Sequence, residues 1–221
     1  MQYYYTMRSY SLVDNKNNPL DFKLNDIFNK DNGFYIELGA NDGLTQSNTA
    51  FFDFYKGWTG ILIEPSISGY TKCKTNRPKN IVLNYACVSN DYDKATVLGD
   101  FNGHLMNSVN GLRLNSNAMV EVPARTLESI LDEYHTKDRV IDFLSLDTEG
   151  YELNILKGLN LDKYRPKYML IEVYNYQYAE LVFFLESKQY KLIANFSNYN
   201  HTDNPVWDGT HNDYLFEDMT S

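Results

Sequence analysis

Short apolar runs alternate along the chain with stretches in which apolar residues recur at helical spacing. We expect the runs to be buried strands, because they are short and are bounded by glycine, proline or other turn residues. The predicted strands are residues 34–39, 60–64, 81–88, 120–123, 141–146, 168–173, 190–196 and 214–216. The predicted helices are residues 21–30, 51–55, 67–76, 127–135, 152–156 and 178–188.

Strands that alternate with helices predict an α/β fold, in which a mostly parallel, Rossmann-like sheet carries helices on both faces. We expect about seven strands, the last of them antiparallel, because no helix separates residues 190–196 from 214–216. The 221 residues fit a single domain, with residues 1–20 as an irregular lead-in. Residues 92–119 and 197–211 are rich in turn residues, and we expect them to be loop insertions over the site.

Residues 34–43, FYIELGANDG, join the first predicted strand to its helix through two glycines. Gly39 can take a positive φ in the tight turn, and Gly43 lets the backbone approach a ligand closely. Glu64 ends the next predicted strand, where its carboxylate can accept hydrogen bonds from both hydroxyls of a ribose. These features outline a nucleoside-binding site, although an ordinary strand, turn and helix without a ligand has the same local pattern.

The turn has the pattern Glu-x-Gly-x-Asn-x-Gly, which lacks the third glycine of dinucleotide-binding turns. NAD is therefore disfavoured, because its pyrophosphate needs that glycine and a helix N-terminus. S-adenosylmethionine has no phosphate and carries a sulfonium, an ammonium and a carboxylate group. Glu37 before the turn and Asn41 within it suit an ammonium group, so S-adenosylmethionine is the favoured ligand.

The chain is acidic, with a formal net charge of −9 and a sequence pI of about 4.9. This charge argues against nucleic acid and against an anionic membrane as partners, and it fits a small neutral or sugar-like acceptor. Cys73 and Cys87 lack the spacing of metal ligands, so a reducing, cytoplasmic location is expected. The first residues have no signal-peptide pattern, and no apolar run approaches the ~18 residues of a membrane span.

Three acids lie at the ends of neighbouring predicted strands: Asp147 and Glu149 in one case, and Glu172 in the other. Since ligands bind at the carboxyl ends of parallel strands, we expect these acids to meet at the site. Three convergent carboxylates repel one another unless a cation, a proton or a substrate lies between them. Alternatively, Asp147 and Glu149 merely cap the helix that follows.

Several motifs occur in the order in which a known family has them. They are ELGANDG at residues 37–43, SNT at 47–49, IEP at 63–65, LDTEGYE at 146–152 and ILKG at 155–158. From about residue 20 to residue 217 the chain resembles the FkbM-like methyltransferases. The resemblance implies the fold of a class I S-adenosylmethionine-dependent methyltransferase, and O-methylation, often of sugars or other hydroxylated natural products.

The resemblance also implies roles for single residues. The methionine half of the cofactor would be held by Glu37, Gly39, Asn41 and Gly43, and the ribose by Glu64. The adenine would lie near Asn90 or Asp91, and the other motif positions expected at the cofactor are Asp42, Asn48 and Pro65.

In the reaction that the resemblance implies, the acceptor oxygen must be aligned with the methyl group and must lose its proton. We expect Asp147 to be the general base, with Glu149 or His104 orienting a small-molecule or oligosaccharide acceptor. A carboxylate base is needed because a sugar hydroxyl is a poor nucleophile while it is protonated.

Mg²⁺ or Mn²⁺ is an open alternative at Asp147 and Glu172, because acids at comparable places bind metal in some related O-methyltransferases. Those enzymes have two consecutive oxygen ligands after the later strand, whereas here Val173 follows Glu172. Two other functions stay open: a non-catalytic Rossmann-like nucleoside-binding module and an NAD-linked enzyme.

Overall fold

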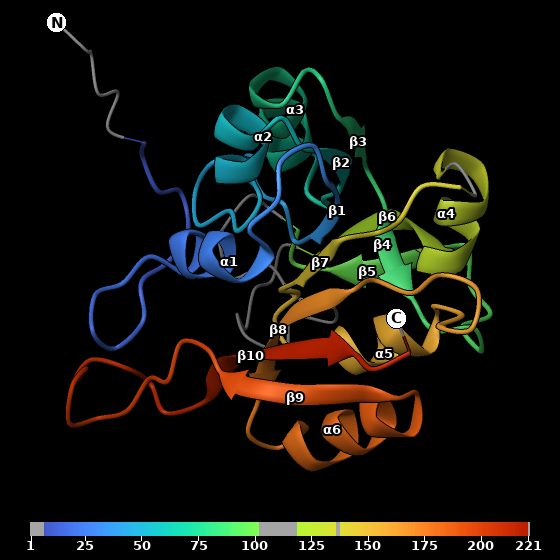
Figure 1. Cartoon of the computed structure of the whole chain (residues 1–221). Helices are drawn as coiled ribbons and strands as arrows, with labels where there is room; N and C mark the ends of the chain where they lie inside the picture. The colour runs from blue at the N-terminus through green and yellow to red at the C-terminus, as the bar shows by residue number, and fades with distance from the viewer. Residues whose placement is uncertain (1–6, 102–118, 136–137, 221) are drawn as a thin grey trace, which may run out of the picture.

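The computed structural model describes residues 7–101, 119–135 and 138–220 and contains a seven-stranded sheet of order β3-β2-β1-β7-β8-β10-β9 (Figure 1). Its strands are β1 (Phe34–Leu38), β2 (Thr59–Ile63), β3 (Ile81–Leu83), β7 (Phe143–Leu146), β8 (Tyr168–Tyr174), β9 (Tyr190–Asn195) and β10 (His211–Asp218). Neighbours are parallel except where β10 pairs with β8 and with β9. The prediction of a mostly parallel sheet with an antiparallel last strand is confirmed.

Helices cover both faces of this sheet, as the alternating pattern predicted. They are α1 (Leu20–Phe28), α2 (Ala50–Lys56), α3 (Ile67–Asn76), α4 (Leu127–Tyr134), α5 (Glu152–Lys157) and α6 (Tyr178–Ser187). Alternate side chains of β1 enter different core layers, because successive strand residues point to opposite faces. Tyr35 packs with residues of α1 and α2, and Ile36 packs with residues of α4, α5 and α6.

A second sheet, of order β4-β6-β5, lies beyond the end of β3 and was not expected. Its strands are β4 (Ala86–Val88), β5 (Thr96–Gly99) and β6 (Val120–Thr126). The predicted strand at residues 81–88 is thus two strands, and the Asn84 side chain between them donates to the carbonyl oxygens of Glu64 and Pro65, each at 2.8 Å. β5 falls in the interval expected to be a loop insertion, of which residues 102–118 lie outside the described part.

The lead-in and the segment before β10 are held together by hydrogen bonds. The Asn15 side chain donates to Asp203 at 3.0 Å, and the Tyr199 hydroxyl donates to the Val13 carbonyl at 2.8 Å. Both segments therefore lie on the sheet face that α1 covers. Among the described residues, no helix is both long and apolar enough to cross a membrane.

Candidate active site

The turn after β1 brings the ends of β1 and β7 into contact. Gly39 has φ +77°, and a Cβ there would lie 1.8 Å from the carbonyl oxygen of Asp147. Glycine is thus required both by the left-handed backbone and by the space. Gly43 also has a positive φ, +78°, and a Cβ there would lie 2.9 Å from the Cys73 sulfur on α3. The close approach at Gly43 is therefore an approach to other residues of the protein, whereas the sequence predicted an approach to a ligand.

Glu37, which was expected to hold the ammonium group of the cofactor, is enclosed by the turn itself. Its carboxylate accepts hydrogen bonds from the hydroxyls of Ser47 at 3.0 Å and Thr49 at 2.6 Å. The fully buried Arg77 lies 3.9 Å from it and pairs with Asp53 at 2.6 Å. Burial raises the pKa of Glu37, whereas Arg77 and the hydroxyls lower it. Glu37 supports the turn from behind and does not line the cavity described next.

A cavity with about 810 Å³ of space, open at its mouth, lies at the carboxyl ends of β1, β2 and β7. Its walls are residues 38–41, 45–47, 63–65, 85–87 and 147–149, with Phe101, Tyr151 and Ile155. Polar groups concentrate at the turn and at residues 147–149, whereas Ile63, Cys87 and Ile155 form an apolar section between them. A cavity that has both an apolar section and polar groups suits a nucleoside ligand, which has a base and a hydroxylated ribose.

Glu64 stands at the end of the cavity formed by β2, where the sequence placed it. Its carboxylate accepts hydrogen bonds from the backbone N–H groups of Asn41 and Ser66, both at 2.8 Å. Burial raises the pKa of Glu64 to about 7, although these N–H groups oppose the shift. Each oxygen has another lone pair for a ligand hydroxyl. Asn41 and Pro65 line the same cavity.

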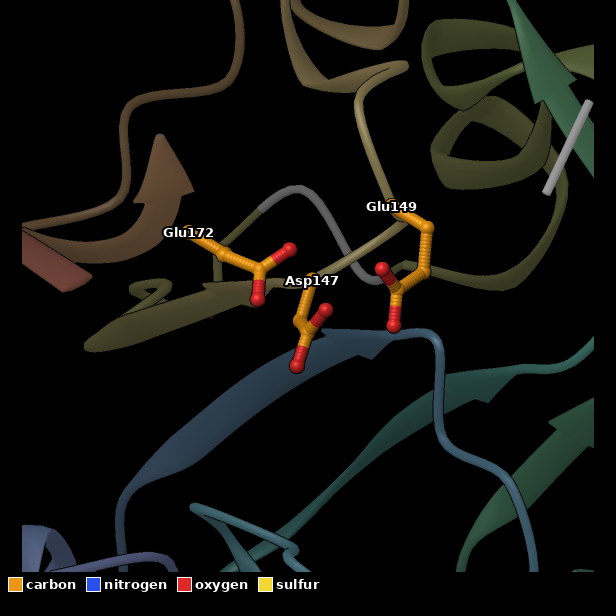
Figure 2. A group of neighbouring side chains, drawn as sticks. All are labelled: Asp147, Glu149 and Glu172. Atoms are coloured by element: carbon orange, nitrogen blue, oxygen red, sulfur yellow. The ribbon is translucent and has the colours of Figure 1, made fainter. Parts of the chain in front are cut away.

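The three predicted acids do meet (Figure 2). Asp147, Glu149 and Glu172 each offer a carboxylate oxygen, and the three oxygens lie within 4.8 Å of one another. Asp147 and Glu172 are neighbours because the register of β7 and β8 pairs Leu146 with Ile171, the residue before each acid. Asp147 and Glu149 line the cavity, and Glu172 lies behind them.

Burial and mutual repulsion dominate the electrostatics of this acid cluster, by which we mean Asp147, Glu149 and Glu172. The pKa of Asp147 is raised well above its usual range by burial and by the charge of Glu149. The pKa of Glu172 is raised well above its usual range by burial and by the charge of Asp147. The cluster thus needs positive charge or protons near neutral pH.

The alternative that Asp147 and Glu149 only cap the next helix finds no support, because the N-cap residue of α5 is Tyr151 and no side chain makes a capping hydrogen bond there. Glu152 accepts hydrogen bonds from the N–H groups of Thr148 at 2.9 Å and Gly150 at 3.1 Å. Glu149 instead accepts a hydrogen bond from the Tyr174 hydroxyl at 2.7 Å. The backbone of Glu149 has φ 57°, which turns its side chain back toward Asp147 (Figure 2).

Two residues of β10 adjoin the cluster and were missed as site residues. His211 was taken for a loop histidine, but it is the first residue of β10, and its Nε2 lies 3.2 Å from Glu172. Asp213 pairs in register with Glu172, and burial raises its pKa to about 6. Extending the predicted strand at 214–216 toward its N-terminus would have revealed both, because alternate positions 211, 213 and 215 share a face.

Other predicted site residues lie elsewhere. Asn90 and Asp91 do not line the cavity, whose wall at this place is residues 85–87. Asp42 accepts hydrogen bonds from the N–H groups of Leu44 and Thr45, so it shapes the turn. Asn48 does not line the cavity either, and its side chain donates to Ser145 at 3.1 Å. His104 lies outside the described residues.

Comparison with known proteins agrees with this geometry. Residues 37–192 match the family described as Methyltransferase FkbM domain, while no curated protein matches the chain. Two solved structures of the METTL16 MTase domain align with 92% of this chain and with 69% and 67% of their own chains, at TM-scores of 0.50 and 0.51 and identities of 13% and 11%. Such identities show a shared fold alone.

A third solved structure, the precorrin-6y C5,15-methyltransferase from Geobacter metallireducens, aligns with 96% of this chain and 94% of its own, at 10% identity and a TM-score of 0.48. The family match covers most of the chain, including the turn after β1, Glu64 and the acid cluster. The chain therefore belongs to the FkbM methyltransferase family and has the fold of a class I S-adenosylmethionine-dependent methyltransferase.

Proposed function

We propose that this protein is an S-adenosylmethionine-dependent O-methyltransferase that acts on a hydroxyl of a sugar or glycan, with Asp147 as the general base. One observation carries the proposal: Glu64 and Asp147 line the same cavity, and they follow β2 and β7, the strands on either side of β1. A nucleoside bound to Glu64 would thus reach toward the carboxylates that follow β7.

The residues of the cavity fit this cofactor. Glu64 offers carboxylate oxygens to the ribose, and the apolar residues Ile63, Cys87 and Ile155 offer a surface for the base. The turn presents backbone groups and the side chain of Asn41 to the methionine half. When bound, the sulfonium of S-adenosylmethionine supplies the methyl group.

The protein must align the acceptor oxygen and accept its proton. A C–O bond forms as the C–S bond breaks, the sulfur keeps the electron pair, and the hydroxyl proton passes to a carboxylate oxygen of Asp147. Glu149 is held by the Tyr174 hydroxyl at 2.7 Å, which leaves it in place to orient the acceptor.

A neutral, polyhydroxylated acceptor suits the charge of the site better than an anion. The acid cluster and a net charge of −9 would repel phosphate or carboxylate groups. Tyr176, which is 71% exposed, packs against Tyr174 beside Glu149 and offers a ring face on which a sugar can stack. This supports an acceptor presented at the surface, as a glycan would be.

The test is product formation with a panel of neutral sugars and oligosaccharides, detected as a mass increase of one methyl group. We expect Asp147→Asn to lower turnover by about 10²- to 10⁴-fold, the usual contribution of a general base. Its affinity for S-adenosylhomocysteine, measured by calorimetry, should stay close to that of the unaltered protein.

Asp26→Asn is the matched control, because Asp26 is an exposed acid of α1 outside the cavity and both measurements should be unchanged. Turnover retained by Asp147→Asn would remove Asp147 from the role of base. Binding of S-adenosylhomocysteine with no product from any hydroxylated acceptor would favour the non-catalytic binding module.

A further inference from the structure

Glu172 is the member of the acid cluster that the proposed proton transfer does not use. It is 8% exposed, and its Oε1 lies 3.2 Å from Nε2 of His211. Its other oxygen, Oε2, is buried and has no hydrogen-bond partner among the described residues. A buried carboxylate oxygen without a partner costs a full desolvation penalty, so such atoms mark places where a ligand or ion belongs.

The carboxylates next to Glu172 suggest which kind of ligand fits there. Figure 2 shows the carboxylates of Glu172 and Glu149 on either side of that of Asp147. One oxygen from each lies within 4.8 Å of the others. Oxygen ligands that share one hard cation are separated by roughly 3 to 5 Å, given metal–oxygen distances of about 2.0–2.6 Å.

Among the described residues, neither Asp147 nor Glu172 forms an ion pair with a lysine or arginine, and the charges that act on both are those of other acids. His211 lies beside Glu172, with its Nε2 3.2 Å from Oε1.

We propose that Asp147, Glu149 and Glu172 hold one divalent cation of the oxygen-preferring kind, Mg²⁺ or Mn²⁺, at the end of the cofactor cavity. The ligand set is all carboxylate, without cysteine or histidine among the three, which favours these ions over zinc. This inference rests on the proposed function for its purpose, because a cation beside the acceptor hydroxyl would lower the pKa of that hydroxyl.

The site also agrees with the role given to Asp147. Each ligand contributes one oxygen, so the second oxygen of Asp147 stays available for the hydroxyl proton. Asp147 and Glu149 line the cavity and Glu172 does not, so a cation held by all three would lie at the wall of the cavity that the acceptor enters. Three ligands leave open positions in an octahedral shell for water and the acceptor oxygen.

The experiment is Mn²⁺ binding to the whole chain after removal of metal with EDTA, followed by the electron paramagnetic resonance signal of free Mn²⁺. We expect one site per chain, competition by Mg²⁺, and at least tenfold weaker binding in Glu172→Gln. Glu149→Gln, a change in the partly exposed loop, should weaken binding in the same way and guards against misfolding of the buried variant.

Glu64→Gln is the matched control, because it also replaces a buried glutamate of raised pKa in the cavity wall, but one that follows β2 and is not part of the acid cluster. Its Mn²⁺ affinity should be unchanged. Equal Mn²⁺ binding by the unaltered protein, Glu172→Gln and Glu149→Gln would overturn the inference, as would a site that takes Ca²⁺ without competition by Mg²⁺.

Assays of methyl transfer distinguish a failure of this inference from a failure of the proposed function. Full activity in EDTA with no Mn²⁺ bound would overturn the cation site and leave the methyltransferase assignment standing. Mn²⁺ bound at the three carboxylates without methyl transfer to any hydroxyl would support the site and overturn the proposed function.

Discussion

Buried glutamates at the ends of neighbouring strands differ in what satisfies their carboxylates. Glu37 is bonded by hydroxyls and neighboured by Arg77, so it belongs to the scaffold. Glu64 has two backbone donors and faces the cavity. Glu172 has one oxygen near His211 and one without a partner among the described residues. The hydrogen-bond partners of each carboxylate, which the sequence does not reveal, therefore distinguish a glutamate that supports the scaffold from one that can bind a ligand.

Glu64 should make cofactor binding depend on pH. Its pKa is raised to about 7 in the free protein and should fall when the ribose hydroxyls donate to it, because they favour the charged form. Affinity is then complete above the pKa of the free protein and is lost as the pH falls through it. We expect S-adenosylhomocysteine to bind about tenfold more weakly near pH ~6 than near pH ~8.

Calorimetry in buffers of different ionisation enthalpy measures both this affinity change and the proton released on binding. Glu64→Gln should bind more weakly overall and show a flat profile over the same range. An unchanged slope in that variant would assign the titration to another group, such as Asp213, whose pKa is raised to about 6.

At the scale of elements, apolar runs and turn residues predicted most of the helices and strands of the main sheet. The strand at residues 81–88 was predicted whole because its apolar run is continuous, yet the Asn84 side chain binds two carbonyls and ends pairing with β2. β5 was missed because it is only 4 residues long and stands among turn residues. Tertiary hydrogen bonds of this kind leave no periodic signal in a sequence.

The carboxyl ends of β1 and β7 lie so close together that Gly39 cannot accommodate a side chain. In Gly39→Ala the new methyl would meet a backbone carbonyl at 1.8 Å, so the two strand ends must separate. We expect a loss of at least about 3 kcal/mol in the free energy of unfolding, measured by urea denaturation. The strain of positive φ accounts for only about 1–2 kcal/mol of it.

Gly209→Ala isolates that strain, because Gly209 has the same φ of +77° but its nearest foreign atom is a His201 ring nitrogen at 3.1 Å. The free energy of unfolding of Gly209→Ala should fall by no more than the energy of the φ strain. Equal losses of unfolding free energy in the two variants would show that the ends of β1 and β7 can separate with no loss of stability.

At the scale of the whole molecule, the strand order places the turn after β1 beside the end of β7, where the two halves of the parallel sheet meet. The sequence predicted this arrangement because alternating strands and helices allow few topologies. It could not place Arg77, an isolated arginine that reaches back to Glu37 and Asp53, since long-range ion pairs have no local pattern. Nor did it place His211 against Glu172, because that contact depends on the register of β8 and β10.

Cofactor binding should stabilise the chain as one unit. A ligand at about 100 times its Kd adds about 2.7 kcal/mol to the stability of the folded state. For a chain of this size that corresponds to a rise in Tm of roughly 5–10 °C. We expect S-adenosylhomocysteine to produce this rise in a thermal melt and NAD to produce none. A rise with NAD alone would instead favour the NAD-linked enzyme.

β10 is the last described strand to leave the ribosome, yet it lies inside the sheet, between β8 and β9. β9 pairs with no other described strand, so it stays unpaired during synthesis until β10 has been made. During the same interval, the backbone groups of β8 that pair with β10 have no partner, including those beside Glu172. The part of the sheet formed by β8, β9 and β10, which includes Glu172, can therefore be completed only after β10 has been made.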